Sequence, residues 1–258
     1  MGRILYNISV MYHFFIDPGN ISGDKVFIEG GDVNHIRNVL RMQKDERLVV
    51  SDGEGSDYLC AIEELGDEEI ICRVISREAS GSECSVRFYL FQGLPKSDKL
   101  EHVIQKSVEL GVYEIIPTNT SRSIVKYDDK KKQSKLTRWQ GIAESAAKQS
   151  HRGVIPVVKP IMSYKEALDY AGKTCDLILV PYENFKDIKG TKEVLSKIKP
   201  GMSVAIFVGP EGGFSEEEMD LARAKDAELI TLGNRILRTE TAPLMLLSVL
   251  TFMLEGEE

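Results

Sequence analysis

The pattern of apolar and polar positions along the chain changes near residue 80. From Met11 to about Glu83, short alternating or apolar runs such as KVFIEG (25–30), RLVVSDG (47–53) and EIICRVIS (69–76) are separated by Gly, Asp and Asn. Apolar residues at every second position are typical of half-buried strands. The first part of the chain therefore predicts a small β-barrel with one helical insert, DVNHIRNVLRM (32–42).

Beyond ASGSE (79–83), apolar runs alternate with longer helical stretches. The runs are VRFYLFQG (86–93), EIIPTN (114–119), VIPVV (154–158), DLILVP (176–181), SVAIFVG (203–209) and LITLG (229–233). Near-continuous apolar strands separated by helices indicate a parallel sheet covered on both faces. We therefore expect a β-barrel domain over residues 11–82 and an α/β domain over 83–258. The latter includes a basic helix over Lys130–Gln149 and an apolar helix over Pro243–Leu254.

Three local patterns predict helix ends. Asp98 with Glu101, and Ser215 with Glu218, have the spacing of a capping box, in which two side chains satisfy free backbone N–H groups of the first turn. Gly111 follows a helical stretch where a left-handed residue commonly ends a helix.

Charge narrows the function classes. The 258 residues carry a net charge of −7 with a pI near 5.3, so the whole molecule should not adhere indiscriminately to polyanions. Residues 122–152 nevertheless hold nine Lys/Arg against three Asp/Glu, which indicates either a local basic surface or a solvated helix face. The longest apolar run, residues 242–254, is shorter than the ~20 residues of a membrane-spanning helix, so we expect no membrane association.

Cysteine usage indicates a reducing compartment. Cys60, Cys72, Cys84 and Cys175 form no C-x-x-C pair, and the first residues do not have the pattern of a secretory signal, so we expect reduced, inert thiols in a cytoplasmic protein. No His/Cys/Asp cluster has the spacing of metal ligands, so no metal is expected. A second methionine, Met11, is a candidate for the natural start.

The glycine-rich stretch FVGPEGGFSEEEMD (207–220) joins a predicted strand to a predicted helix. It lacks the Gly-Lys-Ser/Thr of a phosphate loop, and acids fill the first turn of the helix, so a polyphosphate would be repelled. A rigid Pro210 and one acid, Glu211, between glycines suit a neutral or cationic small molecule. The alternative is a simple turn with glycine caps.

A second polar loop, LGNRILRTETAP (232–243), precedes the apolar helix. Arg235, Arg238 and Glu240 are concentrated there beside two threonines, and polar groups next to an apolar helix need partners. Either they form a functional site, or Arg238 and Glu240 form an ion pair that holds the loop.

These motifs resemble those of the ribosomal small subunit methyltransferase E family, which methylates N3 of a uridine in 16S ribosomal RNA. VGPEGGFSEEE, LGNRILRTETAPL, GLPKSDKLEHVIQKSVELGV, RWQGIAESAAKQSHR and HIRNVLRM carry the resemblance, which spans Met11 to Leu254. One departure is His13, where family members usually have Arg. The resemblance implies a SPOUT-type α/β domain with a C-terminal trefoil knot, preceded by a PUA-like barrel.

The resemblance also implies partners: S-adenosylmethionine as cofactor, a homodimer formed through the knot, and 16S ribosomal RNA as substrate within the assembled 30S subunit. Its cofactor-binding residues map onto Leu179, Gly209, Pro210, Glu211, Gly212, Leu232, Gly233, Ile236, Leu237 and Arg238. We expect RNA phosphates to contact His35, Arg37, Arg41, Lys96, Lys99, Arg122, Arg138 and Arg152. Trp139 and His102 are expected to be packing residues.

Methyl transfer to uridine N3 needs removal of the N3 proton or stabilisation of the anionic uracil. Arg238, supported by Arg235, is the candidate for stabilising the anion, and Glu240 is a weaker candidate base. Two other functions fit parts of the pattern: a ribosome-assembly binding module without activity, and a metabolic enzyme that binds NAD or ATP.

Overall fold

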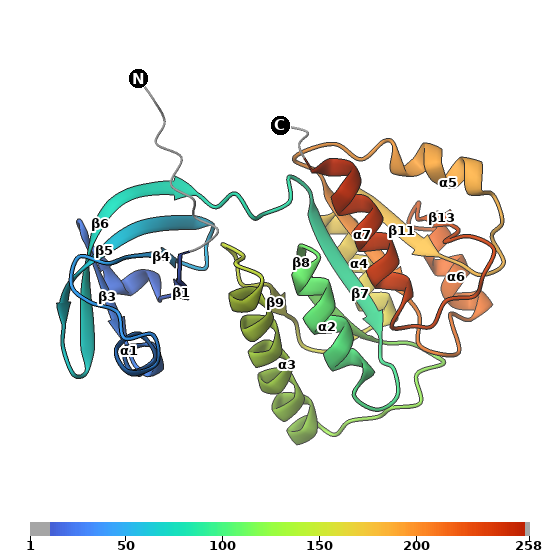
Figure 1. Ribbon diagram of the computed structural model, residues 1–258. Helices are drawn as coiled ribbons and strands as arrows, with labels where there is room; N and C mark the ends of the chain where they lie inside the picture. Colours follow the sequence, from blue (N-terminus) through green and yellow to red (C-terminus); the bar gives the residue numbers. More distant parts are fainter. Residues whose placement is uncertain (1–10, 256–258) are drawn as a thin grey trace. The chain divides into compact units, whose positions relative to one another are not determined.

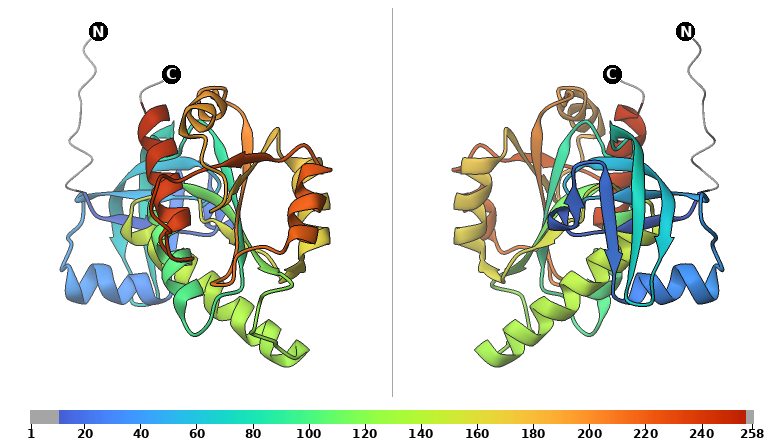
Figure 2. Two further views of the ribbon diagram at one scale, coloured as in Figure 1. Left: turned by 90° about the vertical axis from the view of Figure 1, so that its right-hand side faces the viewer. Right: turned by 90° about the vertical axis from the view of Figure 1, so that its left-hand side faces the viewer.

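The computed structural model describes residues 11–255, so the segment before the candidate start Met11 lies outside the described residues. The chain divides into two compact units (Figures 1 and 2). The first contains the described residues up to Glu83 together with Ala147–Ile155, and the second contains Cys84–Ala146 and the chain from Pro156 onward. The expected boundary at residue 82 did not anticipate that a later segment joins the first unit.

The first unit is a six-stranded mixed sheet in the order β1-β4-β5-β6-β3-β2. β1 pairs with β4 in parallel and all other pairs are antiparallel, so β1 and β2 remain as edges of a half-open barrel. The strands are β1 (His13–Phe15), β2 (Ile21–Ser22), β3 (Lys25–Glu29), β4 (Arg47–Ser51), β5 (Ser56–Leu65) and β6 (Glu69–Ala79).

The helical insert of the first unit is α1 (Gly31–Asn34), which continues as a π-helix over His35–Val39. Its buried Ile36 packs with alternate strand residues such as Val26, Leu48 and Ile62, as the period-two pattern predicts. Cys60 and Cys72 are wholly buried in the same core, and burial raises the pKa of each thiol to about 12. Both thiols are therefore protonated near neutral pH, which agrees with the expected inert cysteines.

The segment Ala147–Ile155 is fastened to the first unit by hydrogen bonds. The buried guanidinium of Arg152 pairs with the carboxylate of Glu83, which also accepts from the backbone N–H of Gly153 at 3.1 Å. The carbonyl oxygen of Gly153 accepts from the N–H of Gly55 at 3.1 Å. A Cβ on Gly153 would lie 2.1 Å from that of Ser80, so only glycine fits without displacing this neighbour.

The second unit is a parallel sheet in the order β10-β8-β7-β12-β11-β13, with β9 beside β8. Every recorded pairing in it is parallel, which confirms the prediction from the continuous apolar runs. The strands are β7 (Arg87–Gly93), β8 (Val112–Asn119), β9 (Val157–Val158), β10 (Met162–Ser163), β11 (Leu177–Pro181), β12 (Ser203–Val208) and β13 (Glu228–Ile230).

Helices cover both faces of this sheet (Figure 2). α2 and α7 pack together on one face, where the hydroxyl of Thr251 donates to the carbonyl oxygen of Leu110, while α4 and α6 pack on the other. The helices are α2 (Lys99–Glu109), α3 (Asp129–Gln149), α4 (Tyr164–Thr174), α5 (Ile188–Leu195), α6 (Glu216–Arg223) and α7 (Ala242–Leu254). The trefoil knot stays a prediction.

The predicted helix ends have mixed outcomes. The Ser215–Glu218 capping box forms at α6, and Gly111 has a φ of +85° directly after α2. The Asp98–Glu101 box is wrong, since the side chain of Asp98 makes no capping hydrogen bond. Glu101 pairs instead with Lys135 and Arg138 of α3, and charged partners outcompete a backbone N–H for a carboxylate.

Candidate active site

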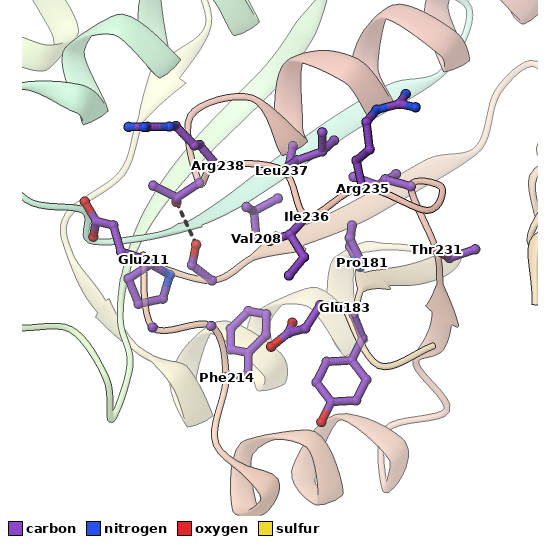
Figure 3. A pocket seen from close by; sticks show the side chains of 18 of the residues that line it. Pro181, Glu183, Val208, Glu211, Phe214, Thr231, Arg235, Ile236, Leu237 and Arg238 are labelled. Atoms are coloured by element: carbon purple, nitrogen blue, oxygen red, sulfur yellow. Dashed lines mark hydrogen bonds between the residues drawn. The ribbon is translucent and has the colours of Figure 1, made fainter. Parts of the chain in front are cut away.

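A cleft of about 410 Å³ opens at the carboxyl ends of β11, β12 and β13 (Figure 3). Three loops line it, within residues 181–186, 208–214 and 231–239. Ligands of parallel sheets bind at this edge, and cavities of roughly 300–1,000 Å³ hold small molecules. The two motif loops identified in the sequence therefore face one another across a single cleft.

The helix that follows the glycine-rich loop, α6, has no free N-terminus for a phosphate. The side chain of Ser215 accepts from the N–H of Glu218 at 3.2 Å, and the Glu218 carboxylate accepts from the N–H of Ser215 at 2.9 Å. The other carboxylate oxygen of Glu218 accepts from the N–H of Ser121 at 2.7 Å. Three consecutive glutamates occupy the first turn of α6. An anion would be repelled there, as the sequence indicated.

The glycines of this loop bring the protein's own atoms together. A Cβ on Gly209 would lie 3.0 Å from the backbone of Gly213, and one on Gly212 would lie 3.2 Å from the Cβ of Arg122. A Cβ on Gly93, at the end of β7, would lie 2.6 Å from the nitrogen of Pro210. The sequence suggested that the glycines admit a ligand, whereas at these positions they admit neighbouring backbone and Arg122.

Lys99 joins the two motif loops. Its ammonium lies 2.9 Å from Oε1 of Glu211 and 3.3 Å from Oε2 of Glu240. Partial burial opposes ionisation of Glu211, but the hydrogen bonds from Lys99 and from the Lys96 N–H outweigh it and hold the pKa of that carboxyl below its usual value. Glu211, expected to face a cationic ligand, is therefore already paired with an ammonium of the protein. The expected alternative, an Arg238–Glu240 ion pair, does not form.

A chain of two hydrogen bonds holds the loop at 231–239 against the glycine-rich loop at 208–214. The side-chain amide of Gln92, wholly buried in β7, donates to the hydroxyl of Thr239 at 2.9 Å. That hydroxyl donates in turn to the carbonyl oxygen of Gly209 at 2.7 Å, the bond drawn dashed in Figure 3. The central strand thus sets the separation of both loops, because each bond is buried or half-buried and directional.

The loop at 231–239 supplies the apolar wall of the cleft. Leu232, Ile236 and Leu237 line it together with the backbone of Gly233, whose φ of +103° favours glycine. The side chain of Ile236 is 84% exposed, and its place over the cleft suits contact with the face of a flat apolar ring.

Arg235 and Arg238 lie on the same loop, and their guanidinium groups point away from the centre of the cleft (Figure 3). Both residues are exposed, and neither guanidinium forms an ion pair or hydrogen bond with the described residues. Two unpaired cations at the rim are available to an anionic macromolecule that approaches the cleft.

A third loop, after β11, was not anticipated. Pro181, Tyr182, Glu183 and Lys186 line the cleft, whereas the predicted Leu179 is wholly buried within β11 and does not line it. No glycine or charge motif marks this stretch. The available signal was its position directly after a parallel strand next to the one that precedes the glycine-rich loop.

The predicted RNA-binding cations of the first unit differ in their surroundings. His35 is exposed, with its ring 6.1 Å from that of Phe14. Arg37 pairs with Asp67 and donates to the carbonyl oxygen of Gly66. Arg41 is exposed, and its φ of +55° makes it a left-handed residue.

The remaining predicted cations are mostly engaged. Arg122 donates to the carbonyl oxygen of Gly212 at 2.7 Å and Arg138 donates to Glu101, whereas the Lys96 side chain is exposed. The prediction that Arg152 contacts RNA is wrong, because the residue is only 3% exposed and its guanidinium forms an ion pair with Glu83.

Two residues expected to pack have opposite outcomes. Trp139 is 1% exposed, as expected, while His102 lies on the exposed face of α2. Over residues 11–255, no group of three or more His, Cys, Asp or Glu side chains could hold a metal ion. No helix in that part of the chain is long and apolar enough to cross a membrane.

The chain is similar to known families and to individual proteins of known name. The profile of a family described as "RNA methyltransferase domain" matches residues 82–251, and that of an "RNA methyltransferase PUA domain" matches residues 28–75. The ribosomal RNA small subunit methyltransferase E of Bacillus subtilis (strain 168) is 37% identical over 231 residues, which cover 88% of this chain and 90% of the relative.

Two solved structures are similar over nearly their whole length. A ribosomal RNA small subunit methyltransferase E from Neisseria gonorrhoeae bound to S-adenosyl methionine is 33% identical with a TM-score of 0.77, covering 94% of this chain and 98% of that one. A putative methyltransferase from Legionella pneumophila in complex with the bound cofactor SAM is 30% identical with a TM-score of 0.78 and the same coverage.

Proposed function

Because this chain belongs to the ribosomal RNA small subunit methyltransferase E family, we propose that its cleft holds S-adenosylmethionine beside N3 of a uridine in 16S ribosomal RNA. It is an S-adenosylmethionine-dependent ribosomal RNA methyltransferase with a PUA-like domain before a SPOUT-type α/β domain. The proposal rests on one observation: the two motif loops, separated by helix α6 and strand β13, form opposite walls of one cleft at the strand ends.

The residues of the cleft fit this cofactor. Apolar Leu232, Ile236 and Leu237 offer one wall to an adenine ring, and backbone groups of the same loop can read the edge of the base. The first turn of α6 carries acids instead of free N–H groups, which disfavours ATP or NAD but not a ligand with a sulfonium cation and no phosphate. When bound, the cofactor supplies an electrophilic methyl group.

The charged residues at the rim of the cleft are our candidates for the chemistry of the methyl transfer. Arg238, with Arg235 beside it, stabilises the negative charge on the uracil oxygens when N3 loses its proton. Both guanidinium groups are unpaired over the described residues and lie at the rim of the cleft, free to contact a base that approaches it. Glu240 is the less favoured base, since its carboxylate lies 3.3 Å from the ammonium of Lys99.

RNA recognition is divided between the two domains, which we place at residues 11–82 and 83–258. His35 and Arg41 in the first unit and Lys96 in the second are exposed residues whose side chains form no ion pair within residues 11–255. They are the favoured phosphate contacts, because Arg138 and Lys99 are already paired with carboxylates. We expect the substrate to be the assembled 30S subunit in the cytoplasm.

We expect the exposed face of α7 to form the interface of a homodimer. Met245, Val249, Phe252 and Met253 are all exposed on this helix, with Phe252 81% exposed. Their spacing of three and four residues places them in one stripe, and a contiguous apolar stripe on a surface marks an interface. A second copy of this chain is the partner that the family resemblance implies.

Transfer of tritium from labelled S-adenosylmethionine to 30S subunits lacking the modification tests the activity, and mass mapping of 16S RNA identifies the nucleotide and atom. In single-turnover assays Arg238→Ala should lower the rate by on the order of a hundredfold with little change in cofactor affinity. Arg223→Ala, at the exposed end of α6 outside the cleft, is the control for lost charge. A normal rate for Arg238→Ala would assign Arg238 a structural role.

A further inference from the structure

A carboxylate that no motif marked projects into the cleft. Glu183 lies two residues beyond the end of β11, and Figure 3 shows its side chain directed toward the cavity between Ile236 and Phe214. The carboxylate forms no hydrogen bond or ion pair with the described residues, and the residue is exposed. It is therefore available to a ligand.

A glycine of the loop at 208–214 leaves room for this carboxylate. A Cβ on Gly213 would lie 3.3 Å from Oε1 of Glu183, and Gly213 has a φ of +66°. The absence of a side chain at Gly213 therefore leaves the Glu183 carboxylate room beside the glycine-rich loop. This side of the cleft is across from the apolar wall proposed for the adenine ring.

The other charged groups of the cleft do not substitute for Glu183. Glu211 is paired with Lys99 at 2.9 Å, and Arg235 and Arg238 point away from the centre. Lys186 also lines the cleft but forms no ion pair with Glu183. A cation inside the cleft consequently meets Glu183 as the carboxylate that is not already paired.

We propose that Glu183 binds the α-ammonium group of the methionine portion of S-adenosylmethionine. This inference rests on the proposed function. An ammonium carries three N–H donors and forms short charge-assisted hydrogen bonds to a carboxylate, whereas a sulfonium has no donor and attracts it without direction. Glu183 is thus a specificity-determining residue, which distinguishes amino-acid-bearing nucleosides from plain ones.

Three ligands separate the possible partners of this carboxylate. S-adenosylmethionine carries the ammonium and the sulfonium, S-adenosylhomocysteine keeps only the ammonium, and methylthioadenosine has neither but keeps the ribose. Isothermal titration of the full chain with each ligand compares the wild type with Glu183→Gln, which keeps the shape and removes the charge. Glu193→Gln, an exposed acid on α5 outside the cleft, changes the net charge equally and serves as control.

We expect Glu183→Gln to weaken S-adenosylmethionine and S-adenosylhomocysteine by similar factors of about tenfold to a hundredfold, as for a lost charge-assisted hydrogen bond. Methylthioadenosine should bind equally to both proteins. Loss for all three ligands would assign Glu183 to the ribose, loss for S-adenosylmethionine alone would assign it to the sulfonium, and no loss would leave it without a binding role. Each of these results overturns the inference. Absence of binding of every ligand to the wild type would instead overturn the proposed function.

Discussion

The hydroxyl of Thr239 donates a hydrogen bond of 2.7 Å to the carbonyl oxygen of Gly209, so a residue of one motif loop holds the backbone of the other. Gln92 completes the contact from the central strand β7. The distance between the two walls of the cleft therefore depends on the buried side chain of Thr239.

Replacing this hydroxyl tests the dependence. Thr239→Val keeps the shape of the side chain but leaves the Gly209 carbonyl oxygen and the Gln92 amide without their partner, at a cost of about 1–3 kcal/mol in the free energy of unfolding. Urea denaturation measures that loss, and titration should show weaker S-adenosylmethionine binding. Thr239→Ser retains the hydroxyl and should behave like the wild type in both measurements. If Thr239→Val also does, these two hydrogen bonds have no part in shaping the cleft.

Lys99 and Lys96 lie three residues apart and should act differently. Lys99→Met removes the ammonium that joins Glu211 to Glu240, so S-adenosylmethionine affinity should fall several-fold while the salt dependence of RNA binding stays the same. Lys96→Met should leave cofactor affinity unchanged. It should make the slope of log affinity against log salt shallower by roughly 0.7–0.9, as for one lost phosphate contact. The reverse pattern would make Lys99 the RNA ligand.

A methyl group at Gly93 should displace the glycine-rich loop that lines the cleft. In Gly93→Ala the new Cβ would lie 2.6 Å from the nitrogen of Pro210, so the glycine-rich loop has to shift. We expect a loss of about 1–3 kcal/mol in the free energy of unfolding and weaker cofactor binding. Gly172→Ala on α4, where a Cβ meets nothing within 4 Å, should be neutral or stabilising by up to about 1 kcal/mol. Equal behaviour of the two variants would contradict the close approach.

His13 should make the first unit sensitive to pH. Its Nδ1 lies 3.3 Å from Nδ1 of His151, and its Nε2 contacts the hydroxyl of Ser51, which donates to Asp57. Burial lowers the pKa of the His13 imidazole below its ordinary value of 6.5; Asp57 offsets this in part, and His151 adds to it. The folded state therefore binds this proton less readily than the unfolded state does, so stability is full above about pH 6.5 and declines as the pH falls below it.

The melting temperature of the wild type between about pH 7 and pH 5.5 measures this decline. The carboxylates with lowered pKa values, such as Glu101 and Glu166, lose their contribution only below their ordinary value of 4.5, outside this window. His13→Gln should flatten the pH dependence, while His102→Gln, on an exposed face, should not. An unchanged slope in His13→Gln would show that His13 is protonated without cost.

The sequence predicted those parts of the fold that depend on local periodicity. The apolar runs fixed the parallel strands because both faces of that sheet are covered, and the Ser215–Glu218 box formed because both partners are local. The Asp98–Glu101 box failed because two cations of α3, about thirty-five residues away in the chain, compete for Glu101, which no local pattern reports.

The candidate site was predicted only where its residues carry a local sequence signal. The loops at 209–213 and 232–238 were found from glycines and clustered polar residues, and both line the cleft. Glu183 was missed because its role depends on the strand order, which places β11 between β12 and β13. Glu211 was assigned to the ligand because its pairing with Lys99, 112 residues away, is visible only in the folded chain.

The attachment of Ala147–Ile155 to the first unit has a consequence for synthesis. A chain that emerges from its N-terminus has made every strand of the half-open barrel by residue 79, yet Arg152 and Gly153, the partners of Glu83, are still to come. Until they arrive, the Glu83 carboxylate and the N–H of Gly55 lack these native partners. The first unit therefore cannot reach its final state until the polypeptide has passed through β7, α2, β8 and α3 of the second, so the two halves of the molecule complete their folding in an interleaved order.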